Sequence, residues 1–278
     1  MRTRIFVPLL TYPDASSEAV VQSAVRFAGM LGEEVRVVAL EADIPPVTSA
    51  LSRVLTNMEE VIRDAERLSA KAGSRLLALA RGEAETAGKD VTARAIKAAP
   101  PVLGEAAAAE ARYFDISVVP WSPAVPCVRI LAEAMVFGSG RPSILTPENA
   151  EGLATGRVAI AWDGSRVAAR AVADAARILD RAEEVHVITV TDEKPLPDDE
   201  VGGRLAEGLR QRGLNARFSP IQAEDCPIAE TLQRHAVELG AGLLVMGGCG
   251  HSRLRDFVLG GATAGVIADL KLPVLLSH

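Results

Sequence analysis

The chain has 278 residues, of which 49% are hydrophobic and 24% charged, so it can form one large or two small globular domains. Its formal net charge of −6 and its lack of a Lys/Arg run exclude a general nucleic-acid binder, which needs a basic surface to displace counterions from phosphates. No stretch of about 20 apolar residues occurs, so we expect no membrane-spanning helix.

The cysteines point to a reducing compartment. Cys127, Cys226 and Cys249 are odd in number and widely spaced, which fits neither a disulfide framework nor a zinc site. The first four residues lead directly into an apolar strand, without the long apolar segment and cleavage site of a secretory signal. We therefore expect a cytoplasmic protein that binds neither membrane nor nucleic acid.

The first half of the chain alternates short apolar runs with amphipathic segments. Strands are predicted at residues 5–9, 35–40, 91–98, 116–119 and 142–145. Helices are predicted between them, at residues 16–31, 49–87, 104–113 and 128–137. Strict alternation of strand and helix is typical of a parallel, doubly wound sheet with helices on both faces.

The second half repeats this order with clearer boundaries. Strands are predicted at residues 157–162, 185–190, 216–221, 243–246 and 273–277. Helices are predicted at residues 165–180, 198–213, 227–239 and 262–270. Ser165 is placed to cap the first of these helices, Pro227 stands near the start of the third, and Gly213 and Gly240 follow helix ends.

The two halves are a duplication of one domain. Residues 141–145 (RPSIL) echo residues 272–276 (LPVLL), and every predicted element has a counterpart in the other half. We predict two tandem Rossmann-like α/β domains, each with a mainly parallel five-stranded sheet, at residues 1–147 and 157–278. A short linker rich in Glu, Asn and Gly joins them.

The clearest chemical signal follows the fourth strand of the second half. Gly247, Gly248 and Gly250 follow Met246. After nine intervening residues, Gly260 and Gly261 precede a helix that contains Ala262 and Thr263. Glycine lets backbone N–H groups approach a phosphate, and a helix N-terminus offers unpaired donors with a partial positive charge. These glycines and Asp163 are also ordinary turn formers, which is the simpler interpretation.

The spacing Gly247-x2-Gly250-x9-Gly260 resembles the nucleotide-binding motif of the universal stress protein family. The resemblance implies an adenine nucleotide alpha hydrolase-like fold that binds ATP, AMP or ADP, with Mg²⁺ accompanying ATP. It also implies that Asp163 contacts the ribose, and that Val190 and Ala161 lie near the adenine. Met246 belongs to the same strand end, and Arg253 is the best candidate in the intervening loop for a phosphate contact.

One position departs from the family pattern. The Ser or Thr that follows the last glycine is Gly261 here, so a hydroxyl group for phosphate is missing unless Thr263 or backbone amides replace it. A hydrogen bond to a charged group contributes about 1.5–3 kcal/mol, so its loss predicts about tenfold to hundredfold weaker binding.

The first half departs further. After the strand at 116–119 it has Pro120, Trp121, Ser122 and Pro123, with no glycine, and proline lacks the N–H that a phosphate would need. No Asp directly follows the strand at 5–9, since Asp14 comes five residues later. We predict that this half has lost polyphosphate binding.

The predicted function is that of a nucleotide-binding regulator or adaptor in a stress response, whose nucleotide-bound state a protein partner recognises. Hydrolysis would be slow at most, because no general base is evident. The alternative is a nucleotide-independent interaction module, favoured by Gly261, the degenerate first half and its long helix. An adenylating ligase or electron-transfer flavoprotein on this fold is disfavoured, because the loops of those enzymes are absent.

Family dimers pair through their last strands, antiparallel and edge to edge. The resemblance therefore implies that residues 142–145 pair with 273–277 inside this chain, which covers both strand edges. The chain would then be a pseudo-dimer in itself, or the unit of a homodimer.

Overall fold

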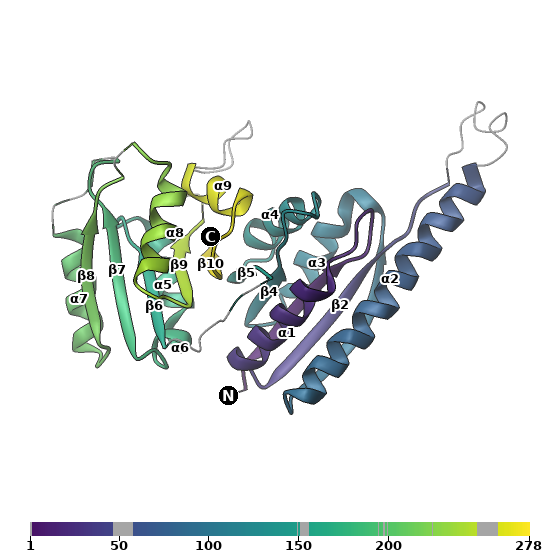
Figure 1. The fold of residues 1–278 in the computed structure, drawn as a ribbon, viewed down its shortest axis with the longest axis horizontal. Helices are drawn as coiled ribbons and strands as arrows, with labels where there is room; N and C mark the ends of the chain where they lie inside the picture. The colour runs from purple at the N-terminus through teal and green to yellow at the C-terminus, as the bar shows by residue number, and fades with distance from the viewer. Residues whose placement is uncertain are drawn as a thin grey trace.

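A computed structural model describes residues 2–46, 58–148, 150, 156–193, 195–196, 198, 200–223, 225–248 and 261–278. Its strands are β1 (Arg4–Leu10), β2 (Glu34–Ala42), β3 (Asp90–Ala98), β4 (Ile116–Pro120), β5 (Ser143–Thr146), β6 (Arg157–Ala161), β7 (Glu184–Val190), β8 (Ala216–Ile221), β9 (Leu243–Gly247) and β10 (Val274–Ser277). These ten strands form one sheet, in the order β3-β2-β1-β4-β5-β10-β9-β6-β7-β8 (Figure 1).

The helices are α1 (Glu18–Leu31), α2 (Met58–Thr86), α3 (Leu103–Ala111), α4 (Val128–Gly138), α5 (Arg166–Asp174), α6 (Ala176–Leu179), α7 (Val201–Gln211), α8 (Ile228–Glu238) and α9 (Gly261–Ala268). A short 3-10 helix, η1 (Pro100–Val102), precedes α3. Strand and helix alternate in both halves, as the hydrophobic pattern predicted. No helix in the described ranges combines the length and the hydropathy needed to cross a membrane.

Within each half all strand pairs are parallel, with the first strand central. The halves meet where β5 and β10 pair antiparallel, with Leu145 opposite Val274 and Ser143 opposite Leu276. This is the pairing expected between residues 142–145 and 273–277. It joins the two predicted five-stranded sheets into one, so a single sheet with two outer edges replaces two sheets with four.

Each face of the sheet is covered by its own hydrophobic layer. Helices α1, α2, α5, α6 and α7 contribute to one buried cluster, and α3, α4, α8 and α9 contribute to the other. Along β1, Ile5 and Val7 belong to the first cluster and Phe6 to the second, because side chains alternate across a strand. The inner strands are therefore buried on both faces and have continuous apolar sequences, whereas the outer strands β3 and β8 are only partly buried.

Two helices differ from their predicted form. The helix expected at 165–180 is divided into α5 and α6 at Ala175, whose backbone angles of φ −82° and ψ −3° leave the regular helix. The helix expected at 49–87 begins, within the described residues, at Met58, and residues 49–57 lie outside them.

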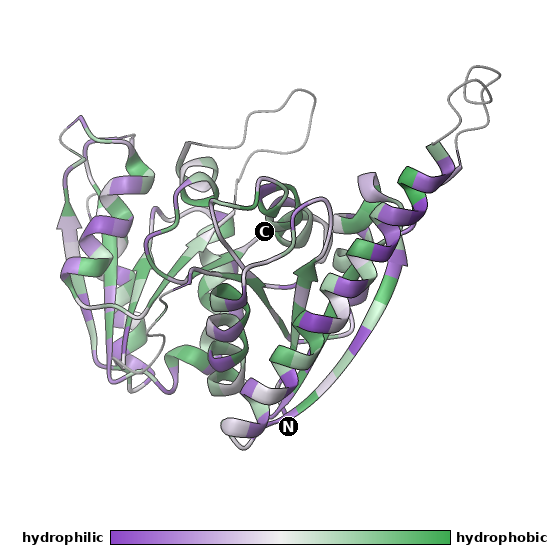
Figure 2. Cartoon of the chain, turned by 45° about the vertical axis from the view of Figure 1, so that its right-hand side comes forward, coloured by the Kyte–Doolittle hydropathy of each residue, from purple (hydrophilic) through white to green (hydrophobic). Residues whose placement is uncertain are grey.

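Helix α2 is much longer than its counterpart α7, with 29 residues against 11. Its buried residues all lie between Ser69 and Ala84, whereas Val61 and Leu68 are 60% and 62% exposed. Figure 1 shows its first turns projecting past the sheet, and Figure 2 shows hydrophilic and hydrophobic residues alternating along it. Only the later part of α2 packs on the sheet.

Candidate functional site

A cleft lies beyond the carboxyl ends of β6, β7 and β9, at the edge of the sheet where ligands bind in open α/β folds. Its empty volume, part of which is open solvent, is about 960 Å³. All predicted site residues that the structure describes line this cleft: Ala161, Asp163, Val190, Met246, Gly247, Gly261, Ala262 and Thr263. The remaining three, Gly250, Arg253 and Gly260, lie outside the described residues.

Asp163 is held by the turn that starts α5. Its Oδ1 accepts a hydrogen bond from the backbone N–H of Ser165 at 2.9 Å, and the Ser165 hydroxyl in turn accepts from the N–H of Ala168 at 3.2 Å. Gly164 between them has φ +75°, a conformation that favours glycine. The turn therefore fixes both the N-cap of α5 and the carboxylate at the mouth of the cleft.

Gly247 lets β9 approach α5 closely. A Cβ atom at this position would lie 2.6 Å from the backbone carbon of Val167 and 2.7 Å from the backbone nitrogen of Ala168. Such distances are well inside van der Waals contact, so no larger residue fits without moving α5. The absence of a side chain here serves packing between two elements of the cleft, a role that the motif alone did not indicate.

Gly248 differs from the expectation that its backbone amide faces a phosphate. Its N–H donates to the carbonyl of Ser277 at 2.7 Å, which extends the pairing of β9 with β10 by one residue. This N–H is already hydrogen-bonded within the protein and is not available to a ligand. Phosphate donors in this segment must therefore come from elsewhere in the cleft, and the described candidates are the first residues of α9.

One wall of the cleft is apolar. Val190 is 7% exposed and Met246 is 4% exposed, and both belong to the same hydrophobic cluster. The wall is completed by side chains that the sequence did not single out: Ile188 of β7, and Ile228 and Leu232 of α8. A planar, largely apolar ring is the kind of group that such a wall accommodates.

The opposite end of the cleft is formed by the start of α9. Gly261, Ala262 and Thr263 are its first three residues, and a Cβ atom at Gly261 would lie within 4 Å of no atom of the described part of the chain. The first N–H groups of any helix lack partners within the helix, so this end offers donors to an anion. Thr263 is only 3% exposed.

The charged residues among the described lining are both acidic, Asp163 and Glu193. No Lys or Arg belongs to that part of the lining, so an anionic ligand would depend there on backbone donors and the α9 dipole. Trp162 also lines the cleft, and its indole N–H donates to the carbonyl of Val201 at 3.0 Å. Sequence reasoning missed Glu193 and Trp162, because neither belongs to a spaced motif.

Comparison with known proteins identifies the half of the chain that contains this cleft. The sequence profile of the universal stress protein family matches residues 155–278. Residues 155–278 form a universal stress protein domain. No curated protein matches the chain.

Solved structures extend the fold similarity to the whole chain. A universal stress protein from Archaeoglobus fulgidus DSM 4304 superposes with a TM-score of 0.63 at 18% identity, and the match covers 98% of each chain. The functionally unknown protein PA1789 from Pseudomonas aeruginosa PAO1 superposes with a TM-score of 0.50 at 16% identity, covering 98% of this chain and 92% of that one. At these identities the likeness establishes a shared fold, and the first half has this fold as well.

The first half holds apolar side chains where the universal stress protein domain has its cleft. The strand register shows which positions of the two halves correspond. Ile5 pairs with Ile116 in the first half, and Val158 pairs with Leu243 at the same place in the second. Counting five residues on from each of these, Leu10 corresponds to Asp163 and Trp121 corresponds to Gly248.

The same count on the neighbouring strands places Leu40 where the second half has Val190. Leu10, Leu40 and Trp121 are at most 4% exposed and belong to one hydrophobic cluster. The first half therefore fills with core side chains the positions that form a cleft in the second. That it does not bind polyphosphate stays a prediction.

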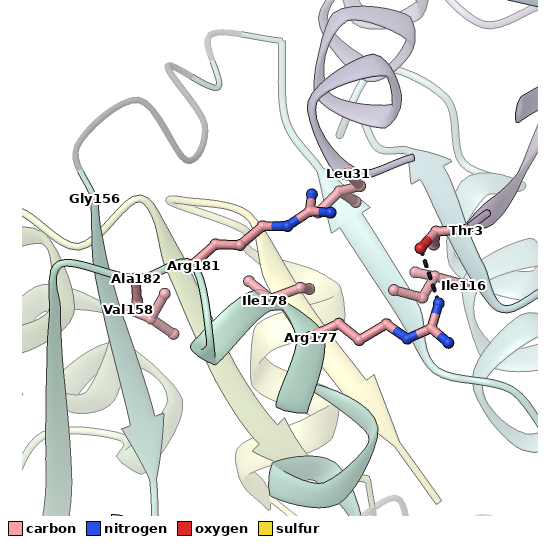
Figure 3. Close-up of a pocket in the computed structure, with 9 residues that line it drawn as sticks. All are labelled: Thr3, Leu31, Ile116, Gly156, Val158, Arg177, Ile178, Arg181 and Ala182. Atoms are coloured by element: carbon pink, nitrogen blue, oxygen red, sulfur yellow. Dashed lines mark hydrogen bonds between the residues drawn. The ribbon is translucent and has the colours of Figure 1, made fainter. Parts of the chain in front are cut away.

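A smaller cavity, with an empty volume of about 460 Å³, lies between the halves near the amino ends of the strands (Figure 3). Thr3, Leu31 and Ile116 of the first half face Arg177, Ile178 and Arg181 of the second across it. The Arg177 guanidinium donates to the Thr3 hydroxyl at 3.0 Å, which links the halves at this end. The lining of this cavity is mainly apolar, and its two cationic side chains, Arg177 and Arg181, are exposed. We therefore treat the cavity as part of the boundary between the two halves, which we call the seam.

Proposed function

We propose that the cleft of the universal stress protein domain binds an adenine nucleotide, ATP or its diphosphate or monophosphate. We further propose that the bound state is read by a protein partner, so that the protein acts as a stress-response regulator in the cytoplasm. The observation that carries this proposal is the convergence of Asp163, Val190 and the first turn of α9 on one cleft.

Each part of the cleft suits one part of the ligand. The apolar wall at Val190 and Met246 suits the adenine, and Asp163 can accept hydrogen bonds from ribose hydroxyls. The N-terminus of α9 suits the phosphates. When bound, ATP brings the negative charge of its phosphates into the cleft. Asp163 and Glu193 would hold a Mg²⁺ ion that neutralises part of this charge.

We propose a binding role for this cleft, with turnover at most slow, because the sequence shows no evident general base near the expected phosphate position. Within the described ranges no group of three or more His, Cys, Asp or Glu side chains is arranged to hold a metal ion.

Isothermal titration with ATP, ADP and AMP tests the proposal. The wild-type protein should bind at least one of them, and Asp163→Asn should weaken binding about tenfold to hundredfold, because a charged hydrogen-bond acceptor is lost. The Asn side chain can still accept from Ser165, so the turn should persist. Asp180→Asn, on the exposed surface at the end of α6, is the matched control and should bind as wild type.

Absence of binding at millimolar concentrations of all three nucleotides would refute the proposal. Equal affinity of the Asp163→Asn variant would refute the assigned role of that carboxylate.

A second candidate function has an observation of its own. The projecting part of α2 exposes Val61 and Leu68, which lie seven residues apart and so on one side of the helix. This favours a nucleotide-independent interaction module. Affinity capture with wild-type and Asp163→Asn proteins separates the two functions, since partners retained equally by both do not depend on the nucleotide.

A further inference from the structure

Helix α9 is anchored at its carboxyl end by the first half of the chain. The indole Nε1–H of Trp121 donates to the carbonyl of Ile267 at 2.9 Å, and Trp121 is only 4% exposed. Ile267 lies in the last turn of α9, where carbonyl groups have no partner within the helix. A residue of the degenerate half thus completes the hydrogen bonding of a helix in the other half.

Helix α8 of the same domain holds both α9 and the residues that follow it. The side chain of Gln233 donates to the carbonyl of Asp269 and accepts from the N–H of Lys271, both at 2.8 Å. A Cβ atom at Gly265 would lie 2.5 Å from the Cβ of Ala229, so α9 packs tightly on α8. The helix has eight residues and is about 12 Å long, so a displacement at one end must reach the other.

The other end of this short helix is the phosphate side of the cleft, at residues 261–263. The end of β9 also touches the first half. A Cβ atom at Gly248 would lie 3.4 Å from side-chain atoms of Val136 and Phe137 in α4, and the Phe137 ring meets His278 edge-on at 5.2 Å. Helices α4 and α9 are in contact, side by side near the centre of Figure 1.

We propose that Trp121 is a positioning residue for the phosphate-binding end of the cleft. By fixing the carboxyl end of α9, it sets where the first N–H groups of that helix point. The first half then contributes to the affinity for phosphorylated ligands, although core side chains fill its own corresponding positions. This inference rests on the proposed function, because it concerns how the same site recognises phosphate.

The test compares ATP with adenosine, which lacks phosphate. Trp121→Phe keeps an aromatic ring and removes the donor. It should raise the dissociation constant for ATP about threefold to tenfold, the range expected for one neutral hydrogen bond, and leave that for adenosine unchanged. The matched control is Arg177→Met, which removes the contact with Thr3 at the far end of the seam (Figure 3) and should change neither constant.

Titration of the wild type with ATP and adenosine comes first and separates the two proposals. If neither ligand binds, the proposed function fails and this inference fails with it. If the wild type binds ATP and the Phe variant binds it equally well, or loses ATP and adenosine in equal measure, Trp121 is merely structural and only the inference fails.

A second measurement uses the wild type alone and holds even if the variant does not fold. Because coupling between sites is reciprocal, ATP should increase hydrogen-exchange protection of α4 in the first half, and adenosine should not. Unchanged protection of α4 with saturating ATP would overturn the proposal.

Discussion

Replacing Gly247 by alanine is the sharpest test of how the cleft is built. The added Cβ would lie 2.6 Å from the backbone carbon of Val167 and 2.7 Å from the backbone nitrogen of Ala168. Both are main-chain atoms in the first turn of α5, so the strand and the helix must separate by several tenths of an ångström. Overpacking of this kind typically costs about 1–3 kcal/mol of unfolding free energy.

Gly261→Ala provides the matched comparison at the other end of the same cleft. A Cβ atom there would meet none of the described atoms within 4 Å, and the residue starts a helix. Alanine at such a site should stabilise the protein by about 0.4–1 kcal/mol, because it restricts the unfolded chain. The same Gly→Ala substitution is thus expected to lower stability at one position of the motif and to raise it at another.

Thermal unfolding followed by circular dichroism, without ligand, measures both effects. The Gly247→Ala variant should unfold about 2–10 °C below the wild type, and the Gly261→Ala variant at or slightly above it. A Gly247→Ala protein with a wild-type Tm would show that β9 does not approach α5 as described, and would refute the reasoning about this position.

Three further substitutions test separate contacts. Ser165→Ala should destabilise the protein by about 1 kcal/mol in urea unfolding, because α5 loses its N-cap acceptor; an unchanged midpoint would contradict the cap. Gln233→Leu should cost about 1–3 kcal/mol in the same assay, because two backbone groups after α9 lose their partner, and a neutral effect would show that they find others. Leu68→Lys should change stability by less than about 0.5 kcal/mol because this side chain is 62% exposed, and a larger loss would indicate that α2 packs against something there.

Much of the architecture could be predicted from the sequence, because most of its strands are buried on both faces. Continuous apolar runs marked the inner strands, whereas the outer strands β3 and β8 are only partly apolar. The predicted strand ends agree with the structure to within about two residues, the usual uncertainty of assignment. The capping role of Ser165 was also readable, since a side-chain acceptor followed by a helical pattern is a local signal. The break at Ala175 was not, because alanine favours helix and gives no sign of it.

The cleft was predictable only where it depends on local motifs. Asp163 and the glycines could be read from their place after strands, but Ile228 and Leu232 reach the cleft from a helix that follows another strand. The amide of Gly248 was expected to be free, and the sequence could not reveal that Ser277 accepts from it. The hydrogen bond from Trp121 to Ile267 spans 146 residues and depends entirely on how the halves meet.

The antiparallel junction of β5 with β10 has a genetic consequence. In a dimer of identical subunits, every substitution is made on both sides of the twofold axis, so neither side can change alone. Here a single covalent chain supplies both sides, and the two strands that meet at its centre are encoded separately. Trp121 can therefore differ from its counterpart Gly248, and one copy can support a helix of the other.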